Sequence, residues 1–311
     1  MKFYKNIFHN GLQLYVRFCF SQNLRIGSVS SSTDLNHKCS IGELKLFLFF
    51  FVLWKIKINK KDMNKIFNDN AISIIDRMIE KNYKIDLIVT DPPYKVTSRG
   101  GYTSAGGMML DEKMRKGDVF KENQISVFDW LPKLYEILKD TGHCYIMCNN
   151  KNLYEFMSAV EKSGFHLVKT MVWGKDNKIM SQAYMSQTEF ILFLRKGAFV
   201  KINNCGTSDL LQIPNKKTKN ENGENIHPTE KPVELMKILI ENSSKDNEIV
   251  FEPFMGVGST CVATVLSNRQ YIGVELDENY FKISEERIKK AWEEKRKEKD
   301  LTQKTLFGDG M

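Results

Sequence analysis

The sequence predicts an α/β fold with one mostly parallel, doubly wound sheet. Apolar runs of strand length recur along the chain, and amphipathic stretches of helical length separate them. This alternation is typical of a parallel sheet whose connecting helices cover both faces. A second observation agrees, because the apolar run 248–253 leads through a glycine-rich turn directly into a helical pattern, as strands and helices join in an open α/β sheet.

The elements are expected from Met63 onward. Residues 63–67 predict a short strand, and residues 71–81 predict an amphipathic helix with apolar positions three and four apart. Further strands are predicted from apolar runs at 85–90, 143–148, 166–173, 189–195, 248–253 and 270–275. Further helices are predicted from helical periodicity at 128–139, 151–163, 233–243, 259–267 and 278–295.

The first 62 residues differ from the rest of the chain. They hold ten Lys or Arg and three Asp or Glu, and so contribute +7 of the formal charge of +8. Their apolar run 46–54 is too short for a membrane helix, which needs about 20 residues, and it starts too deep for a signal peptide. We therefore predict that residues 1–62 are an extension outside the fold. The alternative is an arm that binds DNA or a membrane surface.

The remaining residues predict one domain over 63–295. The hydrophobic fraction of 42% and the charged fraction of 27% are ordinary for a soluble globular protein. A first half is expected at 63–199 and a second half at 227–295, with a short polar loop at 200–226 between them. The alternating charges of residues 296–311 predict a solvated tail.

The six cysteines predict neither disulfides nor a metal site. They contain no C-x-x-C pair, and no group of Cys and His has zinc spacing. Cys144 and Cys148 lie in an apolar strand-like run, where cysteine serves as a small core residue. Free thiols fit a reducing cytoplasm.

A carboxylate, two prolines and an aromatic ring follow the strand 85–90 as Asp91-Pro92-Pro93-Tyr94. Each proline fixes φ near about −65° and lacks a backbone N–H, and Pro93 also keeps Pro92 extended. The turn thus holds an acceptor side chain, free carbonyl oxygens and a flat ring together. It is suited to gripping a planar ring that carries an amino group. An ordinary strand-end turn is the alternative, since Asp-Pro is common in turns.

A second site is predicted at the turn Phe254-x-Gly256-x-Gly258, which follows a buried strand and opens a helix. Glycine lets a backbone approach a ligand closely, and a helix N-terminus favours an anionic group. Glu275 ends the next strand, 19 residues after Gly256, where a nucleoside-binding fold places its ribose-binding acid. Since the third glycine of the dinucleotide fingerprint is missing, a dinucleotide is disfavoured. A purely structural turn is the alternative.

With a third motif, His227-Pro228-Thr229-Glu230-Lys231-Pro232, the chain resembles the DNA adenine methyltransferases that use S-adenosylmethionine. It is similar to the permuted group, in which the catalytic tetrapeptide precedes the cofactor loop. The resemblance spans about residues 63–288. It implies a Rossmann-like methyltransferase sheet whose catalytic half, 63–199, precedes its cofactor half, 227–295, with a short recognition loop at 200–226. Glu252 and Val257 depart mildly from the family, which often has Asp and Ser there.

The resemblance also implies the role of each motif. Asp91 and the Pro92 carbonyl are expected to accept the two amino hydrogens of the target base, within a turn that Pro93 stiffens, while Tyr94 stacks on that base. The base must be flipped out of duplex DNA. The residues expected to bind S-adenosylmethionine are Thr229, Lys231, Glu252, Phe254, Gly256, Gly258 and Glu275. A capped helix start is the alternative for Thr229 and Lys231.

Double-stranded DNA is the partner that the resemblance implies, for a cytoplasmic protein of bacterial or phage origin. Lys and Arg on the loops 95–127 and 200–226 are expected to contact phosphates. Two other functions stay open: N4-cytosine methylation, disfavoured by the Asp that begins the tetrapeptide, and a non-catalytic module that binds DNA or senses the cofactor. The sequence also leaves open the recognition sequence, a homodimer, and a companion restriction endonuclease or none.

Overall fold

The computed structural model describes residues 63–93, 125–179, 184–219, 221–227 and 230–307. The predicted extension 1–62 and most of the predicted loop 95–127 lie outside these ranges.

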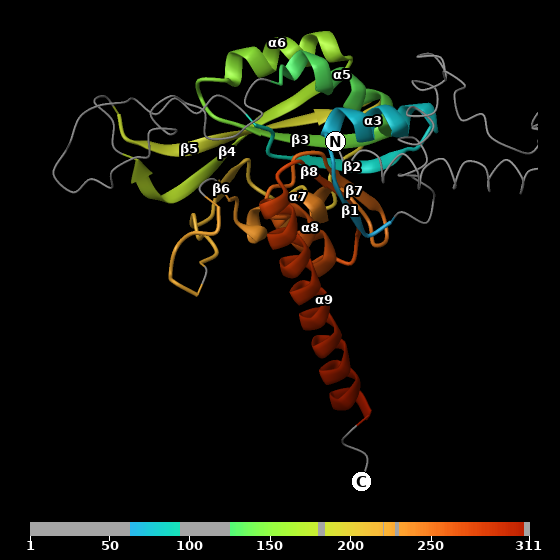
Figure 1. Cartoon of the computed structure of the whole chain (residues 1–311). Helices are drawn as coiled ribbons and strands as arrows, with labels where there is room; N and C mark the ends of the chain where they lie inside the picture. Colours follow the sequence, from blue (N-terminus) through green and yellow to red (C-terminus); the bar gives the residue numbers. More distant parts are fainter. Residues whose placement is uncertain (1–62, 94–124, 180–183, 220, 228–229, 308–311) are drawn as a thin grey trace, which may run out of the picture. The chain divides into compact units, whose positions relative to one another are not determined.

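An eight-stranded sheet forms the centre of the described chain, in the order β1-β8-β7-β2-β3-β5-β4-β6 (Figure 1). Its strands are β1 Lys65–Asn68, β2 Ile85–Thr90, β3 Leu138–Cys148, β4 His166–Ile179, β5 Ser186–Arg195, β6 Leu210–Gln212, β7 Ile249–Glu252 and β8 Gln270–Glu275. Neighbouring strands are parallel except where β5 pairs antiparallel with β3 and with β4. The predicted, mostly parallel sheet is confirmed.

Helices cover both faces of this sheet, as a doubly wound fold requires. They are α3 Ala71–Glu80, α5 Val127–Ile137, α6 Leu153–Ser163, α7 Val233–Ser243, α8 Ser259–Leu266 and α9 Glu278–Phe307. Figure 1 shows α3, α5 and α6 on one face and α7, α8 and α9 on the other. Inward-facing apolar residues of the sheet and of α7 share one core cluster, and a second cluster joins α8 to β8 and α9.

Local sequence explains where these elements begin. Asn70 caps α3, because its side-chain oxygen accepts from the N–H of Ile72 at 2.9 Å and thus satisfies a donor that the first turn leaves free. Ile74, Ile75 and Met78 then form the buried stripe of this helix. The central strand β2 is buried along almost its whole length, as expected of a strand with helices on both faces.

Several elements differ from their predicted bounds, and strand pairing accounts for the following differences. Because β3 begins at Leu138, α5 ends at Ile137, two residues before its predicted end at residue 139. β4 continues six residues past the predicted 173, since it pairs with β5 beyond the apolar run. The segment 200–226, predicted as a polar loop, contains β6 paired to the edge of β4. Pairing between distant segments sets each of these limits.

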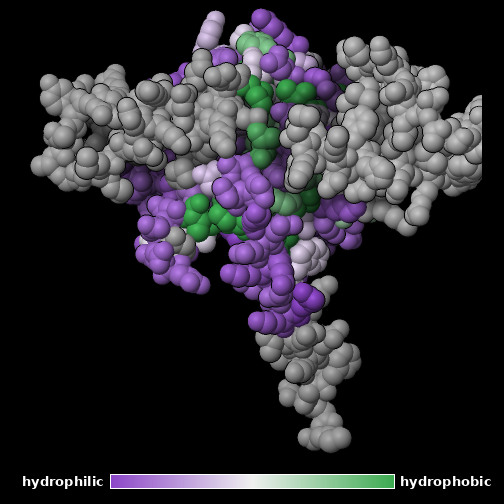
Figure 2. Space-filling model, in the orientation of Figure 1, coloured by the Kyte–Doolittle hydropathy of each residue, from purple (hydrophilic) through white to green (hydrophobic). Residues whose placement is uncertain are grey.

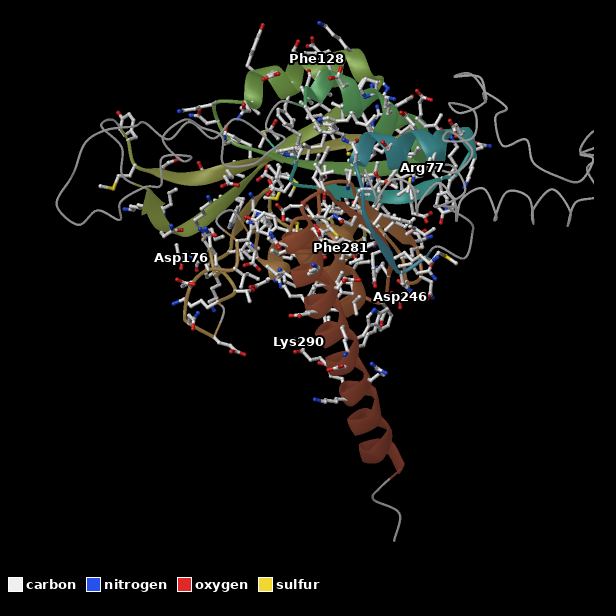
Figure 3. All side chains as sticks on the ribbon, in the orientation of Figure 1. Arg77, Phe128, Asp176, Asp246, Phe281 and Lys290 are labelled. Carbon is white, nitrogen blue, oxygen red and sulfur yellow. The ribbon has the colours of Figure 1, made fainter. Side chains whose placement is uncertain are left out.

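The last helix changes character along its length. Ile288 and Ala291 pack into the core cluster beneath α8, and Figure 3 shows Phe281 near the sheet end of α9, with the exposed Lys290 farther along it. Figure 2 shows hydrophilic residues along this part of α9. Within the described ranges, no helix has both the length and the apolar character that crossing a membrane would require.

The pairing of β2 with β7 determines where a ligand can be held. Leu87 lies opposite Val250, and Ile88 lies opposite Phe251, in a parallel register. The strand that follows β2 in the chain, β3, lies on one side of this pair, and the strand that follows β7, β8, lies on the other. The carboxyl ends of β2 and β7 therefore meet at a topological switch point, the place where open α/β sheets bind ligands.

A substitution at Gly273 in β8 tests how tightly this strand packs against the glycine turn and α8. A Cβ there would lie 2.5 Å from Met255 Sδ and 2.8 Å from Cys261 Sγ, so Gly273→Ala should destabilise the fold by about 1–3 kcal/mol through overpacking. Gly174→Ala is the matched control, since its Cβ would meet no atom closer than 3.7 Å. Urea unfolding measures both changes. Equal midpoints for the two variants would contradict the tight packing at Gly273.

Candidate active site

The catalytic tetrapeptide predicted from the sequence begins directly after β2. Asp91 Oδ2 accepts a hydrogen bond from Lys231 Nζ at 2.7 Å. Asp91 Oδ1 is buried and has no hydrogen-bond partner among the described residues. Pro92 is buried and Pro93 is half-buried, whereas Tyr94 lies outside the described residues. The turn thus presents a carboxylate with one oxygen held and the other available to a ligand.

Lys231, predicted to contact the cofactor, joins two carboxylates in the structure. Its Nζ lies 2.7 Å from Asp91 Oδ2 and 3.4 Å from Glu189 Oε2. Glu189 in turn receives a hydrogen bond from Lys175 Nζ at 2.5 Å. We call Asp91, Lys231, Glu189 and Lys175 the charge cluster. The cofactor contact of Lys231 stays a prediction, since these two carboxylates are the partners that the structure places around its ammonium.

The charge cluster has a marked effect on the pKa of its two acids. Burial raises the pKa of Asp91, Lys231 opposes that rise, and the neighbouring Glu189 adds to it. Burial also raises the pKa of Glu189, but Lys231 and Lys175 together outweigh it and hold this pKa below its usual range. Glu189 is therefore the more firmly ionised acid, and Asp91 is the one more ready to take a proton.

The glycine turn between β7 and α8 has the backbone that only glycine adopts readily. Gly256 has a φ of 51° and Gly258 a φ of 82°, in the left-handed region. A Cβ at Gly258 would also lie 3.0 Å from the Cβ of Ser284 on α9. Gly258 is the N-cap of α8 and has no side chain to occupy the first turn. Gly258 therefore lets the start of α8 pack closely against α9.

Glu275 lies beside this turn, at the end of β8. Its Oε2 accepts from the N–H of Gly256 at 2.8 Å, and its Oε1 accepts from the N–H of Asp277 at 2.8 Å. Burial raises the pKa of Glu275, and these backbone donors oppose the rise. The two N–H groups fix the plane of the carboxylate, and each oxygen keeps a further lone pair with which to accept from a ligand.

Glu252, also predicted to bind the cofactor, is a buried link between the two motifs. Its Oε1 accepts from Thr90 Oγ1 at 2.6 Å and from the N–H of Phe254 at 3.1 Å, while its Oε2 accepts from Thr260 Oγ1 at 2.9 Å. Burial raises its pKa to about 8. Since these partners are internal, the structure gives Glu252 a role in positioning. Its contact with a cofactor stays a prediction.

The third motif, 227–232, lies against the glycine turn. His227 is buried, its ring lies edge-on to Tyr280 at 4.5 Å between centroids, and a Cβ at Gly256 would lie 3.7 Å from its Nε2. Burial lowers the pKa of His227 to about 4, so the ring is neutral at pH 7. Phe254 packs edge-on against Trp130 of α5, with 5.4 Å between centroids. Thr229 lies outside the described residues.

Sequence reasoning missed four residues that support the site. Glu189 and Lys175 complete the charge cluster. Glu230 accepts from Arg287 Nη2 at 2.5 Å, and Arg287 Nη1 donates to the carbonyl of Val257 in the glycine turn at 2.6 Å. A charged residue within an apolar strand was the available signal for Glu189. The sequence carries no signal for Arg287, which is one of many charged residues on α9.

Comparison with known proteins places this geometry in a family. The family model described as DNA methylase, covering N6 and N4 methyltransferases, matches residues 85–286. The chain is 29% identical over 250 residues to the Type II methyltransferase M2.DpnII of Streptococcus pneumoniae, an alignment that covers 74% of this chain and 91% of that protein.

Two solved structures share the fold. The M1.HpyAVI–SAM complex has a TM-score of 0.54 at 24% identity, over 72% of this chain and 98% of that one. The cytosine-N4-specific PvuII DNA methyltransferase has a TM-score of 0.55 at 16% identity, over 72% and 85%. The Rossmann-like methyltransferase architecture is thus confirmed, and the match over residues 85–286 shows that the chain belongs to the N6/N4 DNA methylase family.

Proposed function

We propose that the protein transfers a methyl group from S-adenosylmethionine to the exocyclic amine of adenine in double-stranded DNA. The observation that carries the proposal is the Asp91 carboxylate, with Oδ2 held by Lys231 and Oδ1 buried without a hydrogen-bond partner among the described residues. This oxygen lies at the carboxyl end of β2, which is paired with β7 just before the glycine turn. An acceptor for an amine and a backbone cradle are therefore adjacent.

The proposed reaction depends on the positions of the amine and the methyl group more than on a reactive side chain. The lone pair of an aromatic amine is delocalised into its ring, so the amine is a poor nucleophile. If Asp91 Oδ1 accepts one amino hydrogen and the Pro92 carbonyl accepts the other, the lone pair localises toward the incoming methyl. The turn would also stabilise the positive charge that develops on the nitrogen and hold the reacting atoms in line. Tyr94 would stack on the flipped base.

The residues around the glycine turn fit the proposed cofactor. S-adenosylmethionine supplies an electrophilic methyl group on a sulfonium centre. Gly256, half-buried in this turn, offers backbone without a side chain, and Phe254 offers an apolar ring in the same turn. Gly258 is buried, where a Cβ would crowd Ser284 of α9. Glu275, fixed by two N–H groups, would accept from the ribose hydroxyls. Glu252 would act indirectly, by holding Phe254 and Thr260 in place.

The segment after β6 supports the DNA part of the proposal. Lys216 and Lys219 are exposed on it, and exposed lysines suit phosphate contacts. The N–H of Asn215 donates to Asp176 Oδ1 of β4 at 2.8 Å, and Figure 3 shows Asp176 at the side of the sheet where β6 lies. The segment is thereby fixed to the β4–β5 hairpin, which also carries Glu189 of the charge cluster.

N4-cytosine methylation is the second candidate, because the cytosine-N4-specific PvuII enzyme shares the fold. Both reactions use an exocyclic amine and the same cofactor. The Asp that begins the tetrapeptide favours adenine, since the resemblance associates Ser at this position more often with cytosine. A non-catalytic module is disfavoured, because Asp91, both turn glycines and Glu275 are retained together.

The base preference predicts a product. Incubation of the protein with duplex DNA and tritium-labelled S-adenosylmethionine should label the DNA, and digestion to nucleosides should place the label in N6-methyladenine. Label in N4-methylcytosine would establish the second candidate. Cofactor binding without any labelled DNA, tested on genomic DNA of varied sequence, would favour the non-catalytic module.

Removing the acceptor predicts loss of the chemical step. Asp91→Ala should lower methyl transfer by at least about 100-fold, the usual loss for a group that stabilises developing charge, and should leave cofactor affinity within about threefold. Single-turnover assays and calorimetry measure the two quantities. Asp209→Ala, which removes an exposed carboxylate paired with Lys169, is the control and should retain full activity. Near-normal turnover by the Asp91 variant would refute the assignment.

Removing the proposed ribose acceptor should weaken cofactor binding more than it slows methyl transfer, which is the opposite of the result expected for Asp91→Ala. Glu275→Ala should weaken cofactor binding by about 10-fold or more, because a hydrogen bond to a charged group contributes about 1.5–3 kcal/mol. At saturating cofactor, methyl transfer should recover substantially. Titration calorimetry measures the affinity, and the thermal midpoint without cofactor reports any disturbance of the Gly256 turn. Unchanged affinity in a folded variant would exclude the ribose role.

A further inference from the structure

We propose that Glu189 and Lys175 are positioning residues for the Asp91 carboxylate, on which they act through Lys231. This inference rests on the proposed function and extends the site to two strands, β4 and β5, that carry none of the three sequence motifs.

The register of the β4–β5 hairpin brings these two side chains together. Glu189 lies opposite Trp173, and Lys175 follows two residues farther along β4, so that both side chains lie on one face of the sheet. Lys175 Nζ also stands over the Trp173 ring, 4.8 Å from its centroid. The pairing of β4 with β5 therefore holds both charges on one face of the sheet.

The four charges alternate in sign from Asp91 to Lys175. The separations are 2.7 Å from Asp91 to Lys231, 3.4 Å from Lys231 to Glu189 and 2.5 Å from Glu189 to Lys175. The side chains are only 4% exposed for Lys231, 7% for Lys175 and 15% for Glu189. Burying charges this deeply is unfavourable unless each has a partner. Each charge in the cluster has a partner of opposite sign, and the net charge of the four side chains is zero.

Lys231 has a geometric and an electrostatic effect on Asp91. Its hydrogen bond to Oδ2 fixes the carboxylate so that Oδ1 is the oxygen left for a ligand. A lysine paired with one carboxylate alone would neutralise it and weaken it as an acceptor. Glu189 shares the ammonium, and its negative charge raises the pKa of Asp91, so that the ionised carboxylate is a stronger acceptor. Lys175 limits this effect, because it partly neutralises Glu189.

Other titratable groups interact with Asp91 or with its partners, and the test has to allow for them. Cys148 at the end of β3 and Glu252 at the end of β7 interact electrostatically with Asp91. Lys217, after β6, interacts with Lys231, Lys175 and Glu189. Lys231 and Lys217 interact electrostatically with His227, and Glu230 also interacts with Lys217. All of them stay unchanged in the variants below, so the difference between variants isolates Glu189 and Lys175.

The test is the pH profile of kcat for DNA methylation by the full chain, with both substrates saturating. Activity should fall on the acid side as Asp91 takes up a proton. We call this fall the acid limb of the profile. Glu189→Gln removes a negative neighbour of Asp91, so the acid limb of this variant should move to lower pH. Lys175→Gln removes a positive neighbour, so its limb should move to higher pH. Each shift should be about half a pH unit or more, given the short separations and deep burial. The double variant should return close to wild type.

Matched controls come from the exposed pair on the same side of the sheet. Lys169→Gln and Asp209→Asn remove the same charges from an ion pair that is more than half exposed, where solvent screening makes such pairs weak. Neither should move the limb. Glu189→Gln should also lower kcat more than it changes cofactor affinity, whereas a merely structural role would lower stability and both parameters without opposite pH shifts.

The outcomes separate this inference from the proposed function. Active wild-type protein whose two variants fold but show unmoved limbs, or limbs that move in the same direction, overturns the inference alone. Wild-type protein that transfers no methyl group overturns the proposed function, and the inference falls with it. If Glu189→Gln does not fold, Lys175→Gln and the neutral double variant decide, because only the inference predicts a limb at higher pH that the second substitution restores.

Discussion

The parallel pairing of β2 with β7 is the constraint on which the rest of the site depends. It brings together the ends of two strands whose motifs lie more than 150 residues apart in the chain. Glu252 secures this junction, since its carboxyl group joins Thr90 on one side to Thr260 on the other. With a pKa raised by burial to about 8, this acid is largely neutral at pH 7. It binds the two halves through hydrogen bonds to Thr90 and Thr260.

The charge cluster connects the tetrapeptide that begins at Asp91 to strands β4 and β5. Ion pairs buried to this extent contribute little net stability, because desolvation offsets their attraction. An apolar substitute would fold as well, so stability does not explain their presence. Function does, if the site needs an ionised acceptor out of contact with bulk water. Lys231 favours the charged form of Asp91 in that setting, and Glu189 shares the lysine's charge.

Much of this arrangement could be predicted from the sequence, because its signals are local. β8 and α7 have their predicted bounds, and the glycines of the cofactor turn have the positive φ that their spacing indicates. The charge cluster could not be predicted, since the register that unites Glu189 with Lys175 arises only when β4 and β5 pair. The same holds for β6, which is only three residues long and forms by pairing with β4.

The permuted order of the motifs has a physical consequence. Lys231 belongs to the predicted cofactor half, yet its ammonium contacts the carboxylate of Asp91 in the predicted catalytic half. Two residues after Lys231, the chain enters α7. Glu230, next to it, is held by Arg287, which also holds the glycine turn through the carbonyl of Val257. The glycine turn is therefore connected to Lys231 through two side chains, Arg287 and Glu230, and one peptide bond. The two motifs lie apart in the sequence, but these contacts join them in the structure, as the proposed function requires of a base acceptor and a cofactor cradle.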